Sequence, residues 1–338
     1  MPRLFAALLA FLVTACHQPP PVIDLSGPTM GTTYSVKVVG APEGVDSHAV
    51  RVAIDDVLAT IDVQMSAYRP DSEISRFNAS GTTDWFAVSG EFVAVVTGAQ
   101  VVSERSGGAL DITVAPLVTL WGMGPAGEMK ELPDEPTLAA ARARVGYRNL
   151  EVRQTPFAIR RRIPELTVDL NAVTPGYAVD LLSSKFEALG IANFMIDIGG
   201  EVRARGRNAQ GAAWRIAIER PVDAEPEPFA IAQIDDMAIT TSGEYRHYVM
   251  RDGHRYSHTI DPRTGRPVEH ALASVAVVQP TALEADAWAT ALNVLGENEG
   301  YELAEKLRIP ALFIVAKGDG LEHRMTTPFA KYLAEPLR

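Results

Sequence analysis

The sequence reads QPTALEADAWATALNVLG over residues 279–296, and this stretch predicts a helix. Thr281 and Glu284 have the spacing of a capping box, which satisfies backbone N–H groups at a helix start. Gly296 supplies a helix stop. The helix is expected to pack one apolar face and to carry oxygen-donor side chains beside it. The apolar side chains recur at helical spacing, at Leu283, Ala287, Ala291 and Val294.

Two oxygen-donor side chains of this helix, Asp286 and Thr290, lie four residues apart. That separation is about one helical turn, so their oxygens can converge on one point. Hard oxygen ligands of this kind suit Mg²⁺ or Ca²⁺ rather than zinc. A structural explanation is also open, because the helix dipole favours an acidic residue in the first turns and Thr often bonds to its own backbone. Taken alone, the pair favours the structural explanation.

Composition limits the possible functions. The chain has 338 residues, enough for a large core in one domain or two closely joined ones. Its formal charge of −11, without any block of Lys or Arg, argues against a nucleic-acid partner. An acidic protein that handles an anionic substrate needs local positive charge, and a divalent cation is the obvious source.

The N-terminus predicts export. Residues 1–16 read MPRLFAALLAFLVTAC, with Arg3 before an apolar stretch and small residues before Cys16. The ending VTAC resembles a bacterial lipobox, in which the cysteine carries the lipid. An ordinary signal peptide with a chance cysteine is the alternative, but Cys16 is the only cysteine and has no pairing partner. We therefore expect a lipoprotein signal at 1–16, a stiff Pro-containing tether at 17–28 and a folded domain at 29–338.

Hydrophobic periodicity predicts an α+β fold. Residues 193 onward are rich in strand patterns separated by Gly, Pro and Asp turns, ending in a strand near residue 325, with a helix at 281–295. Helices and strands occur in blocks with hairpins, which favours a mostly antiparallel sheet covered by helices. In the first half we predict a strand at 32–39, helices at 46–65, 89–104 and 134–145, a structured loop at 65–80, and short strands at 150–152, 157–160 and 166–168.

Another helix start is predicted at Thr174 and Pro175, as an N-cap followed by proline at the first helical position, with Gly190 as the end. Open N–H groups at such a start attract phosphate. Asp169 lies just before it. Plain helix capping explains this segment equally well.

Two further segments are candidates for ligand binding. The pair Gly107 and Gly108 precedes Asp111, so backbone could approach a flat ligand closely, although a helix C-cap followed by a buried strand gives the same pattern. His258 and Asp261 lie just before a Pro-Arg-Thr-Gly turn. A histidine close to an aspartate at a strand end is a candidate general base.

Together these segments resemble the FAD:protein FMN transferases, the ApbE-like family, from Thr29 to about Lys317. The segment DLNAVTPGYAVD departs from the family pattern. Asn171 and Ala172 stand where relatives have glycines, and Pro175 replaces a long polar residue that contacts FAD. The motifs that carry the resemblance are TMGTTYSV, MSAYRPDSEISRFN, ALDITVAPLVTLWG, DLNAVTPGYAVD, SHTIDPRTGRP and EADAWATAL.

The resemblance implies roles for individual residues. The metal would be Mg²⁺, held by Asp286 and Thr290, an oxygen at Thr174, and the backbone carbonyl of Ala289. His258 or Asp261 would deprotonate the acceptor hydroxyl. The implied FAD-binding residues are Met30, Tyr68, Ala109, Leu110, Asp111, Asp169, Pro175 and Ile260.

The implied activity is Mg²⁺-dependent transfer of FMN from FAD to a Thr or Ser hydroxyl of an exported flavoprotein, with release of AMP. The enzyme would face the periplasm or the exterior from the bacterial cell envelope, anchored to the membrane through Cys16. Two alternatives stay open. Water as the acceptor would make the protein an FAD pyrophosphatase, and a chain without catalysis would be a flavin-binding lipoprotein.

Overall fold

An antiparallel sheet forms the centre of the computed structural model, which describes residues 20–124, 131–222, 225–243, 248–251, 254–318, 320–335 and 337. The sheet has eight strands within these ranges, and each neighbouring pair is antiparallel. This confirms the predicted α+β class. In spatial order the strands are β1 (Val22–Thr29), β2 (Thr32–Val39), β6 (Phe194–Ile198), β7 (Glu201–Arg205), β10 (Met237–Gly243), β15 (Leu272–Gln279), β16 (Ala311–Lys317) and β17 (Gly320–Met325).

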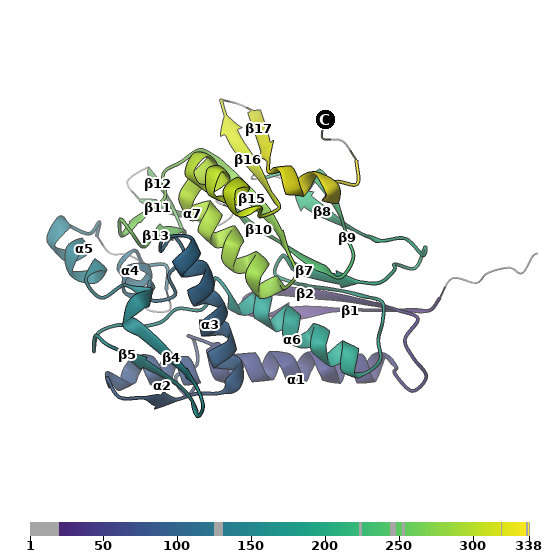
Figure 1. The fold of residues 1–338 in the computed structure, drawn as a ribbon, viewed down its shortest axis with the longest axis horizontal. Coiled ribbons are helices and arrows are strands. Elements are labelled where there is room, and N and C mark those ends of the chain that lie inside the picture. The colour runs from purple at the N-terminus through teal and green to yellow at the C-terminus, as the bar shows by residue number, and fades with distance from the viewer. Residues whose placement is uncertain are drawn as a thin grey trace, which may run out of the picture.

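Alternating side chains give the sheet two apolar faces. On β6, Ile196 belongs to the large core under the helices, whereas its neighbour Met195 packs against a smaller core on the opposite face. Figure 1 shows α6 and α7 on one side of the sheet and the β8–β9 hairpin on the other. The first layer contains α1 (Ser47–Met65), α3 (Gly90–Arg105), α6 (Thr174–Ala188) and α7 (Ala282–Leu307), and the second contains β8 (Trp214–Glu219), β9 (Pro228–Ile234) and the 3₁₀ helix η2 (Thr327–Tyr332).

Shorter elements extend the helical side. Three short strands make a separate sheet in the order β3–β5–β4, and two small hairpins lie near the end of β10 (Figure 1). The shorter elements are α2 (Glu73–Ser80), β3 (Phe86–Ala87), α4 (Ala115–Leu120), α5 (Glu135–Arg142), η1 (Tyr147–Asn149), β4 (Leu150–Gln154), β5 (Phe157–Arg161), β11 (Tyr248–Arg251), β12 (His254–Ser257), β13 (Ile260–Asp261) and β14 (Arg266–Pro267).

The starts of α6 and α7 cap each other. On α6, the Asp180 carboxylate accepts the backbone N–H groups of Ala282 and Leu283, each at 2.9 Å. On α7, Oδ2 of Asp286 accepts the N–H of Gly176 at 3.1 Å. These bonds satisfy donors that a helix start leaves open, and each places a carboxyl group at a positive dipole end. A residue of each helix therefore fixes the beginning of the other.

The helices can cross so closely because residue 176 has no side chain. A Cβ built on Gly176 would lie 2.4 Å from the carbonyl oxygen of Ala282 and 2.9 Å from Cβ of Asp286. The nearest atom is backbone, which cannot rotate away. Glycine at this position is therefore a requirement of the helix crossing.

The structure corrects the predicted N-terminal boundary. The sequence predicts a tether up to residue 28, but Val22–Thr29 form β1, which pairs with β2 along its whole length. The physical reason is alternation, because Ile23 and Leu25 pack against the core. The predicted signal at 1–16 and its Cys16 lie outside the described residues. Over the described ranges, no helix is long and apolar enough to cross a bilayer.

Two predictions around helix termini are wrong in detail. Thr174 is the first residue of α6 rather than its N-cap, since Val173 takes the non-helical position and Asp286 supplies the capping oxygen from α7. At Gly296 the backbone leaves helical geometry (φ 75°, ψ −174°), but a further helical segment continues to Leu307. Thr281 caps α7 as predicted, accepting the N–H of Glu284 at 3.2 Å.

Two predictions of local structure also fail. Residues 73–80 of the predicted loop form α2, because Ser72 caps a helix that buries Ile74 and Phe77. Residues 166–168 form no strand, although Leu166 and Val168 are buried. Val168 exchanges both of its backbone hydrogen bonds with the Asn78 side chain instead of a neighbouring strand.

Replacing Gly176 with alanine should destabilise the protein by about 1–3 kcal/mol, through overpacking against the backbone of Ala282. Helix propensity alone predicts the opposite sign, because alanine is favoured over glycine in a helix by up to about 1 kcal/mol. The free energy of unfolding in denaturant measures the effect. Gly320→Ala is the control, since its nearest atom lies at 3.8 Å. A Gly176→Ala protein as stable as wild type would contradict the close crossing.

Candidate functional site

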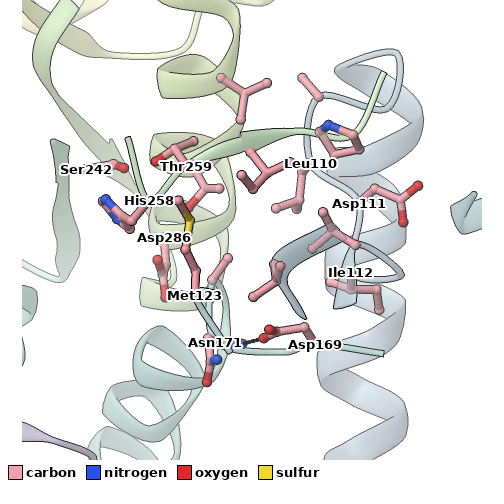
Figure 2. A pocket seen from close by; sticks show the side chains of 18 of the residues that line it. Leu110, Asp111, Ile112, Met123, Asp169, Asn171, Ser242, His258, Thr259 and Asp286 are labelled. Carbon is pink, nitrogen blue, oxygen red and sulfur yellow. Dashed lines mark hydrogen bonds between the residues drawn. The ribbon is translucent and has the colours of Figure 1, made fainter. Parts of the chain in front are cut away.

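A cavity of about 350 Å³ opens where α7, the end of β10 and the loop before α6 meet. Figure 2 shows that side chains from these elements, and from the segments around residues 110 and 258, surround this cavity. The structure thus brings together segments that are far apart in the chain. The residues proposed from the sequence that line this cavity are Ala109, Leu110, Asp111, Asp169, His258, Ile260, Asp286 and Thr290.

Asp286 lies in the wall of the cavity formed by α7 and is 6% exposed. Its Oδ2 accepts the amide of Gly176, while Thr290 lines the same wall one turn further along α7. Burial raises the pKa of Asp286 well above its ordinary value, and the Glu201 carboxylate raises it further. An ionised Asp286 therefore needs a cation or additional donors in this cavity.

Glu201 is a second carboxylate of the cavity, and the sequence reasoning missed it. Burial raises its pKa to about 8, and the nearby Asp197 carboxylate contributes in the same direction. Glu201 begins β7 directly after Gly199 and Gly200, which both have positive φ and make the turn from β6. The available sequence signal was an acidic residue directly after a glycine pair at the end of a strand pattern.

Asp111 borders the cavity, but its carboxylate is engaged elsewhere. Oδ1 accepts the backbone N–H of Thr113 at 2.8 Å and its hydroxyl at 2.6 Å, and Oδ2 accepts the N–H of Tyr147 at 2.8 Å. In Figure 2 this carboxylate points away from the other labelled side chains. Burial raises its pKa in spite of these bonds. Asp111 therefore holds two loops in place, and Ala109 and Leu110 line the cavity beside it.

Asp169 lies at the side of the cavity formed by the loop before α6. Its Oδ1 accepts the N–H of Asn171 at 2.8 Å, as the dashed line in Figure 2 shows. Its backbone N–H donates to the carbonyl of Ile112 at 2.7 Å. Burial raises the pKa of Asp169. Asp169 therefore connects the loop that contains residues 109–112 to the loop that contains residues 169–172.

The structure separates the two candidate bases. His258 is exposed and lines the cavity, whereas Asp261 is 7% exposed and does not line it. Oδ2 of Asp261 pairs with the guanidinium of Arg263 at 3.0 Å, and Oδ1 accepts the Arg263 backbone N–H at 2.8 Å. Asp261 therefore stabilises the Pro-Arg-Thr-Gly turn, and His258 is the candidate base that the cavity presents.

Besides Asp261, five other proposed residues are absent from the cavity lining. Met30 occupies the β1–β2 turn with φ 46° and is 41% exposed, and Tyr68 is 73% exposed in the loop before α2. Thr174 is buried with its hydroxyl 3.9 Å from Sδ of Met65. The other two are Pro175, in the first turn of α6, and Ala289, buried on α7 beside Thr290.

The end of β10 supplies further cavity residues that the sequence reasoning missed. Thr240, Thr241, Ser242 and Gly243 are consecutive at this strand end and all line the cavity. The hydroxyl of Thr240 is buried and has no hydrogen-bond partner among the described residues. A buried hydroxyl without a partner favours a polar ligand. The hydroxyl-rich run TTS was the available sequence signal.

The oxygen donors of the cavity side chains suit a hard cation only if further oxygen ligands complete its coordination. Asp286, Glu201 and Thr290 offer oxygen atoms, which Mg²⁺ prefers. Across the described residues, however, no three His, Cys, Asp or Glu side chains group so as to hold a metal ion. Backbone, hydroxyl or substrate oxygens would have to complete the coordination, as is usual for Mg²⁺ beside phosphates.

The chain is similar to known proteins over nearly its full length. It is 41% identical to the FAD:protein FMN transferase of Vibrio cholerae over 98% of this chain and 99% of the relative, and 39% identical to that of Salmonella typhimurium over 98% and 97%. Among solved structures, the flavin transferase ApbE from Vibrio cholerae has a TM-score of 0.86 at 42% identity, covering 93% of this chain and all of that one. The apo form of Pseudomonas stutzeri flavinyl transferase ApbE has a TM-score of 0.87 at 37% identity, covering 95% and 99%.

A family model confirms the resemblance seen in the sequence motifs. The model of the ApbE family matches residues 30–313, which include every segment that lines the cavity. The chain therefore belongs to the ApbE family.

Proposed function

We propose that this chain transfers FMN from FAD to a Thr or Ser hydroxyl of another protein, releases AMP and depends on Mg²⁺. The observation that carries the proposal is one cavity lined by His258, by Asp286 and Thr290, and by the loops around 110 and 169, in a chain of the ApbE family. The relatives named above are FAD:protein FMN transferases.

The transfer itself is a substitution at phosphorus. The acceptor hydroxyl oxygen bonds to the phosphorus on the FMN side of the FAD pyrophosphate, and the bond from that phosphorus to the bridging oxygen breaks. AMP leaves with the bridging oxygen and its electron pair. An imidazole nitrogen of His258 takes the hydroxyl proton, because this side chain is the exposed base in the cavity wall.

The metal would be held by Asp286 and Thr290, with oxygens of Thr174 and Ala289 as further proposed ligands. Two features support the fit. The Asp286 carboxylate is buried close to Glu201, which disfavours its ionised form without a cation, and the unpartnered hydroxyl of Thr240 adds a polar group to the cavity. When bound, Mg²⁺ would neutralise negative charge on the phosphoryl oxygens.

The remaining expected FAD contacts divide into two groups. Ala109, Leu110 and Ile260 line the cavity and would pack against the nucleotide. Met30 and Tyr68 lie on exposed turns outside its lining, and we propose that they contact the flavin ring where it leaves the cavity. Pro175 offers no polar group, so any contact it makes with FAD would be apolar.

The first experiment follows AMP release and acceptor mass after the protein is mixed with FAD, Mg²⁺ and exported flavoproteins of its host. The wild-type protein should release AMP and increase the acceptor mass by one FMN group. Asp286→Asn should slow turnover by about 100-fold or more through loss of a charge-stabilising ligand, while its amide oxygen can still accept from Gly176. Glu284→Gln, exposed on the same helix, is the control and should behave as wild type.

The products of that assay decide between transfer and its alternatives. AMP together with free FMN, and no modified protein, would replace transfer by hydrolysis. If FAD binds but is never cleaved, the protein would be a flavin-binding protein without catalytic activity. A fully active Asp286→Asn protein would remove the metal assignment.

The pH dependence of the free energy of unfolding tests the raised pKa of Glu201. The folded-state pKa of Glu201, about 8, lies above its ordinary value, so the folded protein binds this proton more tightly than the unfolded chain does. Its stabilising contribution is therefore complete below about pH 4 and is lost as the pH rises through 8. In metal-free buffer, the free energy of unfolding should fall more between pH 5 and 9 for wild type than for Glu201→Gln. Equal falls in the free energy of unfolding for the two proteins would contradict a raised pKa at Glu201.

We also propose that Cys16 carries a lipid that anchors the protein in the bacterial cell envelope. The support is the signal-like sequence that ends at this only cysteine. In a bacterial host, Cys16→Ser should move the protein from the membrane fraction to the soluble fraction and remove the lipid mass from its N-terminal peptide. Membrane association unchanged by this substitution would exclude the anchor.

A further inference from the structure

A second cavity, of about 580 Å³, lies on the face of the sheet opposite α6 and α7. The central sheet forms one wall through β2, β6, β7 and β10, and β8 of the hairpin forms the other. The transfer chemistry described above uses none of this volume.

The two walls present their strands differently. On the sheet wall, lining residues alternate, for example Met195 and Asp197 on β6, so the cavity meets a sheet face. On β8, the consecutive residues 215–219 all line it. Neighbouring side chains of a strand point to opposite faces, so a consecutive run means that the cavity follows the edge of β8.

The backbone of β8 points hydrogen-bonding groups toward this edge. Ala217 pairs with Ile231 of β9, and the Ile231 carbonyl accepts the N–H of Ala334 at 2.9 Å, on the side of β9 away from β8. Ile231 therefore belongs to a non-hydrogen-bonded pair, and so does Ala217. The N–H and C=O of Ala217 point away from β9, and in the described part of the chain β8 pairs with no other strand.

The two cavities meet at the end of β10. Thr241 and Gly243 line both of them, and Glu201, in the first cavity, follows the Gly199–Gly200 turn that lines the second. The two cavities therefore share the end of β10, which is where a chain lying along β8 would approach the first cavity.

We propose that an extended segment of the acceptor protein adds as a strand to the edge of β8 at Ala217, so that its Thr or Ser side chain enters the first cavity beside Thr241. This inference rests on the proposed transfer and names the docking surface of its protein substrate. Strand addition binds mainly through backbone groups, with side-chain pockets adding specificity. The five lining residues of β8 span about 16 Å of extended chain.

The other features of the cavity fit a polypeptide. Its sheet wall carries Thr33, Ser35 and Asp197, polar groups that can bond to a main chain or its side chains. Apolar Ile216 and Ile218 lie beside the edge and can pack against alternate side chains of an added strand. The residues shared with the first cavity also fit an occupant that delivers a hydroxyl there, as a protein acceptor does.

Ala217→Pro tests the added strand directly. Proline removes the outward N–H and obstructs pairing, yet it is tolerated at an edge position whose N–H does not bond to β9. Ala217→Ser is the matched control, since it keeps the N–H at the same exposed position. With an acceptor that wild type modifies, Ala217→Pro should lower kcat/KM for the acceptor by about tenfold or more. The affinity for FAD should not change, and Ala217→Ser should match wild type.

The outcomes separate the docking inference from the proposed function. Equal acceptor kcat/KM for wild type and Ala217→Pro would overturn docking and leave transfer standing, whereas a wild type that cleaves FAD but modifies no host protein would overturn both. Hydrogen exchange on the wild-type protein gives a second measure that needs no variant. The outward-pointing amides of Arg215 and Ala217 should gain protection when the acceptor is added, and unchanged exchange at both would also overturn the docking surface.

Discussion

The reciprocal capping of α6 and α7 is the interaction on which the rest of the site depends. Asp180 closes the start of α7 and Asp286 closes the start of α6, and the absence of a side chain at Gly176 lets the two starts approach. A helix start is the one place where backbone leaves several N–H groups open, so carboxylates are well suited to join two such starts. The crossing sets where α7 runs, and α7 sets where Asp286 and Thr290 meet the cavity.

Asp286 combines a structural role with a proposed ligand role, and this explains why sequence reasoning found both explanations open. Local spacing could not choose between helix capping and metal binding. In the fold, Asp286 caps a helix other than its own, which no local pattern reveals. One oxygen serves the fold, and the carboxylate as a whole is still part of the cavity wall.

Much of the fold could be predicted because it follows from local periodicity. The strand at 32–39, the helices at 46–65 and 89–104 and the antiparallel class all emerged from spacing alone. The errors have a common cause in tertiary contacts. The Asn78 side chain takes the place of a strand partner for Val168. Residues 22–28, predicted as a tether, form a strand because they pair with β2. Motif resemblance located most of the cavity, but Glu201 and the hydroxyls of β10 were missed, because only the fold brings these strand ends beside α7.

The mutual capping also has a consequence for local stability. The amide of Gly176 is held by a residue 110 positions away, and those of Ala282 and Leu283 by one more than 100 positions away. Helix starts normally fray independently of one another, because their first N–H groups lack helical partners. Here neither start can open without releasing the carboxylate that caps the other. We therefore expect this wall of the cavity to open as one cooperative unit, built from two segments that are distant in the chain.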